Sequence, residues 1–192
     1  MKALLIPFKD PSRGKTRLAA CLSEEERRAL AWAMFQDVTE AATCVGRCDA
    51  VVIVSSYGPA IQRARFLGFD VIVEQSQHSE SESVDAASAT LTTRGFDAVL
   101  RLPADVPLVR AEDIDELFLS ELVPPAALMV ASRDGTGTNA LFRTPATIFP
   151  SRFADANAER NFVEVACDEV GKKLSCVLVE HVKRDTPTRA QS

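Results

Sequence analysis

The segment VLRLPADVPL (residues 99–108) decides the fold, because it joins a buried strand to a short, rigid loop. The loop carries one carboxylate, Asp105, between Pro103 and Pro107, and each proline fixes its own φ at about −65°. In open α/β sheets, ligands bind just outside the carboxyl ends of the strands. Asp105 is therefore a candidate ligand for a hard cation such as magnesium. The alternative is an aspartate that only shapes the turn.

Composition and charge exclude several classes of protein. The chain has 192 residues, of which 46% are hydrophobic and 26% are charged, and this predicts one globular domain over residues 1–192. We find no apolar run long enough to cross a bilayer, and the apolar run at the N-terminus is too short for a signal peptide. The net charge of −5 argues against a general affinity for nucleic acid. We expect a cytoplasmic protein that binds neither nucleic acid nor a membrane.

Apolar runs alternate with helical patterns along the first two thirds of the chain. Predicted strands cover 3–6, 50–54, 71–73 and 98–102, and predicted helices cover 23–42, 60–67, 84–93 and 111–122. Ser23 followed by Glu26 is a capping-box pattern that begins the first of these helices. Solid aliphatic strands that alternate with helices are typical of an α/β protein with a parallel sheet covered on both faces. Further on, we predict strands at 127–131, 138–142 and 174–179 and a helix at 161–170, whereas the polar segment 75–83 is predicted to be a loop.

A basic loop follows the first predicted strand. It holds Lys9, Arg13, Lys15 and Arg17, and Asp10 is the only acidic residue in positions 1–18. Lysine and arginine bind phosphates through point charge and paired hydrogen bonds, and the loop occupies the usual phosphate-binding position of an α/β sheet. Its single glycine excludes the P-loop and dinucleotide-binding patterns. A solvated surface loop is the alternative.

Two further stretches are candidates for the same site. In RDGTGTNAL (residues 133–141) the glycines allow tight turns and close approach to a ligand, and Thr138 and Asn139 add donors and acceptors. The same stretch is a strong hairpin signal, and both interpretations can hold. Asp185 follows the last predicted strand. It either joins Asp105 in holding a magnesium ion or caps a C-terminal helix.

The blocks at residues 6–18, 102–108 and 135–141, with a weaker one at 185–187, resemble the guanylyltransferases of coenzyme F-420 biosynthesis. Those enzymes act on 2-phospho-L-lactate, phosphoenolpyruvate or 3-phospho-D-glycerate. The resemblance implies a three-layer α/β/α Rossmann-like nucleotidyltransferase fold with a mixed, mostly parallel sheet. It also implies magnesium-dependent transfer of GMP from GTP to the phosphate of a small phosphorylated acid, with release of pyrophosphate.

The resemblance assigns roles to individual residues. The implied catalytic residues are Lys15, Arg17 and Asp105. The implied nucleotide-binding residues are Pro7, Lys9, Arg13, Lys15, Ser55, Asp85 and Pro103. Thr138, Asn139 and Asn157 would bind the phosphorylated acid, and Asp105 and Asp185 would hold the magnesium ion.

The chain also departs from the family pattern at three places. Ser83-Val84-Asp85 replaces a glycine-leucine-asparagine block, residues 153–158 lack the glycine and serine of the loop that receives the acid's phosphate, and Lys183 stands where an acidic residue is common. Two alternatives therefore remain: a transferase of the same fold with another acceptor, such as a molybdopterin, or a nucleotide-binding protein without catalysis. Transient contact with the downstream transferase of the pathway and a homodimer are further expectations.

Overall fold

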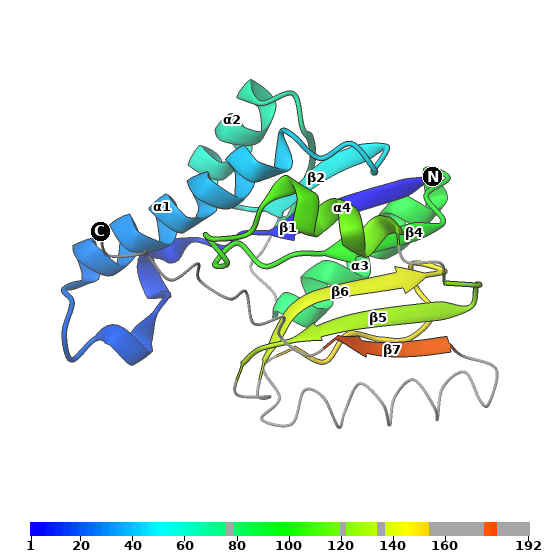
Figure 1. The fold of residues 1–192 in the computed structure, drawn as a ribbon. Coiled ribbons are helices and arrows are strands. Elements are labelled where there is room, and N and C mark those ends of the chain that lie inside the picture. Colours follow the sequence, from blue (N-terminus) through cyan, green and yellow to red (C-terminus); the bar gives the residue numbers. More distant parts are fainter. Residues whose placement is uncertain (76–78, 120–121, 134–136, 154–174, 180–192) are drawn as a thin grey trace, which may run out of the picture.

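The computed structural model describes residues 1–75, 79–119, 122–133, 137–153 and 175–179, which build one twisted sheet with helices on both faces (Figure 1). The strands are β1 (Lys2–Pro7), β2 (Ala50–Ser55), β3 (Asp70–Val73), β4 (Ala98–Arg101), β5 (Ala126–Ala131), β6 (Thr138–Thr144) and β7 (Ser175–Val179). The helices are α1 (Glu24–Ala42), α2 (Gly58–Phe66), α3 (Glu80–Thr93) and α4 (Ala111–Leu119), and the short 3-10 helices are η1 (Pro11–Arg13) and η2 (Thr16–Leu18).

The sheet is mixed and mostly parallel, as predicted. Its seven strands lie in the order β3-β2-β1-β4-β6-β5-β7. Among these strands only β6 is antiparallel to its neighbours, β4 and β5. Because of this reversal, the amino end of β6 lies at the same edge of the sheet as the carboxyl ends of β1 and β4. Segments far apart in the sequence therefore meet at that edge.

Buried aliphatic side chains cover both faces of the sheet and make it the middle layer of three. On one face Phe35, Ala64 and Phe118 from α1, α2 and α4 pack in one cluster with Leu4 and Leu100. On the other face, α3 packs against the sheet in a second cluster. Its buried residues include Val84, Ala87 and Leu91 of α3 and Leu5 and Val99 of the sheet. The uninterrupted burial along β4 and along β1 from Ala3 onward confirms the predicted coverage of both faces.

Helix α3 begins earlier than predicted, and the prediction of a loop through residue 83 was wrong. Ser79 is the N-cap of α3. Its hydroxyl accepts a hydrogen bond from the Glu82 amide, and the Glu82 carboxylate accepts one from the Ser79 amide. This capping box repeats the arrangement of Ser23 and Glu26 at the start of α1, which the sequence did reveal. The box places Glu80, in the first turn of α3, at the edge where β1 and β4 end.

The structure describes one of the two last predicted elements. The last predicted strand is present as β7, whereas the predicted helix at 161–170 lies outside the described residues. Cys21, Cys44 and Cys48 are free thiols. Within the described part of the chain, no helix is both long enough and apolar enough to span a membrane.

Candidate active site

The basic loop between β1 and α1 is held in a defined shape at the carboxyl edge of the sheet. The Asp10 carboxylate accepts a hydrogen bond from the Ser12 amide (2.9 Å) and caps η1, which begins with Pro11. Lys15 has a left-handed backbone with φ of 52°, a conformation that costs a non-glycine residue about 1–2 kcal/mol. Such strain is concentrated at functional sites, where the surrounding structure maintains it.

The loop after β4 faces the basic loop. The Lys15 Nζ atom donates to the Asp105 Oδ2 atom at 2.6 Å, although the two residues lie 90 positions apart in the sequence. The side chain of Asp105 is 51% exposed and that of Lys15 is 28% exposed. A cation and a carboxylate from two different loops thus meet where an α/β sheet binds its ligands.

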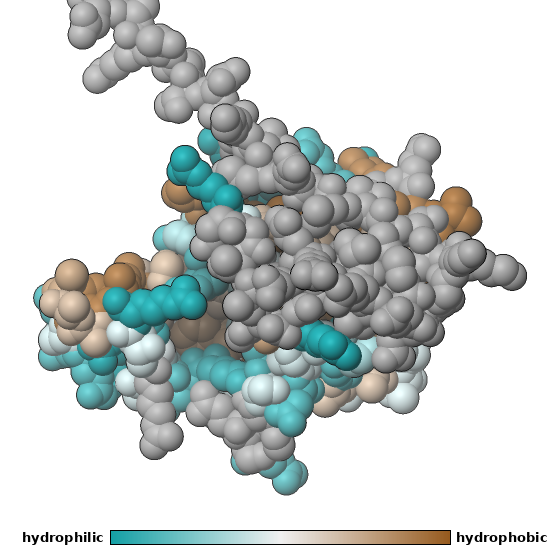
Figure 2. All heavy atoms as spheres, turned by 90° about the horizontal axis from the view of Figure 1, so that it is seen from below, coloured by the Kyte–Doolittle hydropathy of each residue, from teal (hydrophilic) through white to brown (hydrophobic). Residues whose placement is uncertain are grey.

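The two loops border a cleft of about 520 Å³. Seven of the predicted site residues line it: Pro7, Lys9, Lys15, Pro103, Asp105, Thr138 and Asn139. In the view from below, the molecule is hollowed, with brown hydrophobic side chains at the bottom of the hollow and teal hydrophilic ones along its rim (Figure 2). The volume lies within the range that is usual for small-ligand sites.

The amino end of β6 forms another wall of the cleft. The Ser132 hydroxyl accepts a hydrogen bond from the Gly137 amide (2.7 Å), which closes the turn between β5 and β6. Asn139 donates its side-chain amide to the Ala131 carbonyl (3.3 Å), so that residue both lines the cleft and ties β6 to β5. Thr138 donates its hydroxyl to the Met129 sulfur (3.6 Å).

Arg101 and Glu80 also line the cleft, and the sequence analysis missed both. Arg101 is the last residue of β4, and its guanidinium forms an ion pair with Glu80. The arginine side chain is 5% exposed and the glutamate 38%. A signal was available, because Arg101 is a charged residue within the otherwise aliphatic run Val99–Leu102, and buried charges require partners.

A family model described as "Guanylyl transferase CofC like" matches residues 1–162. The chain belongs to this family. Three curated relatives carry different acceptor names. A 2-phospho-L-lactate guanylyltransferase of Methanothermobacter thermautotrophicus is 29% identical over 80% of this chain and 66% of its own. A phosphoenolpyruvate guanylyltransferase of Mycolicibacterium paratuberculosis is 28% identical over 81% and 72%. A 3-phospho-D-glycerate guanylyltransferase of Colwellia psychrerythraea is 28% identical over 77% and 69%. The chain thus spans about two thirds of the length of these relatives.

Solved structures show the same fold as this guanylyl transferase family member. A crystal structure from Desulfovibrio desulfuricans G20, described as that of a nucleotide-diphospho-sugar transferase, superposes with a TM-score of 0.73 at 18% identity. The match covers 93% of this chain and 79% of the other. The predicted nucleotidyltransferase fold is therefore confirmed.

The remaining predicted site residues of this family member lie elsewhere or outside the described residues. Ser55 is buried, donates its hydroxyl to the Phe8 carbonyl (2.5 Å) and accepts the Tyr57 amide (2.9 Å). Arg17 lies exposed in η2. Asn157 and Asp185 are outside the described residues, and only the backbone of Arg13, in η1, is described.

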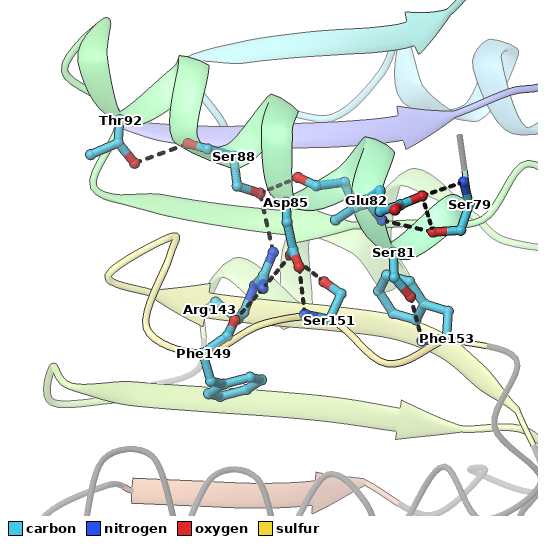
Figure 3. A network of polar contacts seen from close by, with 11 residues as sticks. Ser79, Ser81, Glu82, Asp85, Ser88, Thr92, Arg143, Phe149, Ser151 and Phe153 are labelled. Atoms are coloured by element: carbon cyan, nitrogen blue, oxygen red, sulfur yellow. Dashed lines mark hydrogen bonds and ion pairs between the residues drawn. The ribbon is translucent and has the colours of Figure 1, made fainter. Parts of the chain in front are cut away.

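Asp85 belongs to a network between α3, β6 and residues 149–151, and it is absent from the described lining of the cleft (Figure 3). Its carboxylate accepts hydrogen bonds from the Arg143 guanidinium (3.0 Å), the Ser151 amide (2.8 Å) and the Ser151 hydroxyl (2.6 Å). Arg143 is 1% exposed and also donates to the Ser88 hydroxyl and the Phe149 carbonyl. Burial lowers the pKa of the Arg143 guanidinium, and the Asp85 charge and hydrogen bond oppose this shift.

The charges around the cleft are balanced. Among the described lining residues, three are cationic (Lys9, Lys15 and Arg101) and three are acidic (Asp10, Glu80 and Asp105). These described side chains by themselves supply no net positive charge to gather several phosphates. Asp105 offers the hard oxygen ligand that magnesium prefers, in a half-exposed position that substrate phosphates can share. The described residues contain no group of three potential metal ligands, and the predicted partner Asp185 lies outside them.

Proposed function

We propose that this family member transfers GMP from GTP to the phosphate of a small phosphorylated carboxylic acid. The observation that carries the proposal is the ion pair between Lys15 and Asp105, which joins the phosphate-binding loop to the predicted metal ligand across the cleft. Membership in the guanylyl transferase family supports the choice of nucleotide.

The chemistry of this transfer suits a cleft without histidine or cysteine, and neither occurs among its described lining residues. The phosphate of the acceptor is already an anion at neutral pH, so no side chain needs to remove a proton from the nucleophile. One of its oxygens forms a bond to the α-phosphorus of GTP, and the bond between the α-phosphorus and the bridging oxygen breaks as pyrophosphate leaves. Alignment and charge stabilisation by the protein account for catalysis of this type.

The proposed roles follow the positions of the side chains. Lys15 and Lys9 bind the phosphates of GTP, and Arg13 and Arg17 supply further positive charge from the same loop. Thr138 and Asn139, on the wall formed by β6, orient the phosphorylated acid, together with the predicted residue Asn157.

We also propose that the enzyme requires Mg²⁺, held by Asp105 and by the predicted ligand Asp185. When bound, the ion would offset the negative charge of the phosphates, which the balanced lining of the cleft does not do. When the Asp105 carboxylate serves as a metal ligand, Lys15 can exchange its present partner for a phosphate oxygen of GTP.

The acceptor is proposed only as a chemical class, because the curated relatives carry the names of three different acids. A role in coenzyme F-420 biosynthesis, a cytoplasmic location and transient contact with a transferase that consumes the product belong to the same proposal. The predicted homodimer stays a prediction.

The test is incubation of the full chain with GTP, Mg²⁺ and each of the three acids, followed by mass spectrometry of the product. We expect a guanylylated acid and an equal amount of pyrophosphate, and we expect EDTA to suppress both. ATP and CTP in place of GTP control for the nucleotide. Turnover with a different nucleotide or acceptor would show another transferase of this fold. GTP binding without turnover for any acid would show a nucleotide-binding protein without catalysis.

A further inference from the structure

Arg101 places a nearly buried guanidinium in the wall of the cleft. In the sequence, this residue lies far from the basic loop. It donates from Nη1 to the Thr138 carbonyl at 2.7 Å and from Nε to the Glu80 Oε1 atom at 3.0 Å, and Nη2 contacts the same Glu80 oxygen. These contacts with the described residues use three of the five N–H donors of the guanidinium. A buried cation with spare donors beside a ligand cleft can bind an anion.

Glu80 is an imperfect partner for this guanidinium. Arginine and a carboxylate pair best through two parallel hydrogen bonds to two different oxygens. Here both N–H contacts end on the same atom, Oε1 of Glu80. The glutamate is also 38% exposed and lies in the first turn of α3, so it can turn toward solvent while Arg101 stays in place.

The surroundings of Arg101 leave its edge available for a planar anion. The guanidinium carbon lies 4.2 Å from the centre of the Phe153 ring, so that ring covers one face of the arginine. Phe153 is itself anchored, because its amide donates to the Ser81 hydroxyl of α3 at 2.9 Å (Figure 3). The aromatic ring, the anchored backbone and the Thr138 carbonyl together hold the arginine rigid for recognition of a carboxylate.

The acceptor of the proposed reaction, on which this inference rests, has two anionic ends. Its phosphate must lie beside the α-phosphate of GTP, at the end of the cleft marked by Lys15 and Asp105. Its carboxylate then needs a cation elsewhere in the cleft, and Arg101, paired with Glu80, is a cation of the lining that lies outside the basic loop.

We propose that Arg101 binds the carboxylate of the acceptor and that Glu80 occupies this carboxylate's place in the free protein. Binding of the acid exchanges one carboxylate for another, and Arg101 keeps its contacts with Thr138 and Phe153. Arg101 is thereby a specificity-determining residue that distinguishes phosphorylated acids from phosphate esters that lack a carboxylate, and Glu80 competes with the substrate.

The proposal predicts effects of opposite sign for the two members of the pair. Arg101→Gln and Arg101→Lys remove the planar fork, so we expect affinity for the acid to fall about ten- to a hundredfold. Glu80→Gln removes the competing charge and leaves Arg101 in place, so we expect affinity for the acid to rise by about two- to tenfold. A glutamate that only supports the structure would give a loss of affinity in this variant.

The experiment is isothermal titration of each variant without GTP, so that it does not depend on turnover. The probes are two matched pairs of ligands: 3-phospho-D-glycerate with glycerol 3-phosphate, and 2-phospho-L-lactate with isopropyl phosphate. The second member of each pair keeps the phosphate and lacks the carboxylate. Glu40→Gln is the matched control, because Glu40 pairs with Arg63 between α1 and α2 and is not part of the cleft lining.

We expect the unmodified chain to prefer the acid of a pair and the Arg101 variants to lose that preference, with binding of the esters that lack a carboxylate unchanged. Tighter acid binding by Glu80→Gln, with no change in Glu40→Gln, supports the exchange. Weaker acid binding by a folded Glu80→Gln protein, or an acid preference that survives in Arg101→Lys, would overturn the proposal. If acids bind as expected but no guanylylated product forms, the proposed function fails and the assignment of Arg101 stands.

Discussion

Two ion pairs near the same sheet differ in their burial and in the number of hydrogen bonds that hold the carboxylate. Asp105 meets Lys15 through a single hydrogen bond, from exposed loops at the border of a cleft. Asp85 accepts three hydrogen bonds, from a buried arginine and from Ser151, between α3 and β6. The first carboxylate can exchange its partner for a ligand at little cost, whereas the second cannot lose a partner without leaving a buried charge unpaired. Substitutions of Asp105 and Asp85, which the sequence alone does not distinguish, are therefore expected to have different effects.

Substitution of Asp105 tests the exchangeable member of this comparison and has the largest expected effect. We expect Asp105→Ala to lower kcat/KM for guanylyl transfer by about a thousandfold, because it removes the proposed metal ligand. The free energy of unfolding should change by at most about 1 kcal/mol, because the Asp105 side chain is 51% exposed and pairs through one hydrogen bond. Pyrophosphate release and urea denaturation measure the two effects, and near-normal pyrophosphate release would refute the catalytic role.

Substitution of Asp85 tests the buried member. We expect Asp85→Ala to lower the free energy of unfolding by about 3–5 kcal/mol, because Arg143 is 1% exposed and would lose its counter-charge. Urea denaturation measures the loss, and Asp85→Asn, which keeps the shape, serves as its control. The predicted nucleotide-binding role of Asp85 gives a different result: a raised KM for GTP in a variant of unchanged stability.

The two capping boxes sharpen the comparison, because only the box of α3 holds a residue of the cleft lining, Glu80, in the first turn of its helix. Ser79→Ala and Ser23→Ala should each cost about 1 kcal/mol of stability through the lost N-cap hydrogen bond. We expect only Ser79→Ala to change the KM for the acceptor, because Ser79 precedes Glu80. Thermal unfolding measures the stability of the two variants, and initial rates give their KM values. Equal KM values would show that the start of α3 does not contribute to acceptor binding.

Substitution of an exposed glutamate away from the cleft has the smallest expected effect. Glu40 lies 3.5 Å from Arg63, which also donates to the Thr39 hydroxyl and the Gln36 carbonyl. Glu40→Gln should therefore change the free energy of unfolding by about 0.5 kcal/mol or less and leave kcat and KM unchanged. A large loss of stability in urea would show that exposure alone does not separate the two kinds of ion pair.

Local patterns predicted some elements well and others badly. The Ser23–Glu26 capping box correctly located the start of α1, and the same pattern at Ser79–Glu82 was overlooked within a polar stretch. Arg101 was overlooked because a single charge in an aliphatic run does not reveal its partner. That partner, Glu80, lies 21 positions earlier and comes to it only through the packing of α3 against the sheet.

By itself, the sequence determined the alternation of strands and helices, the basic loop after β1 and the rigid aspartate loop after β4. These features depend on the spacing of hydrophobic residues and on the backbone restrictions of proline, and both are set by residues close together in the sequence. Only the tertiary structure decided which carboxylate pairs with which cation. Insertion of β6 in the reverse direction brings Thr138 to the cleft, and Arg143, farther along the same strand, reaches Asp85 of α3. Such pairs form between segments far apart in the chain, so their partners follow from strand order and helix packing.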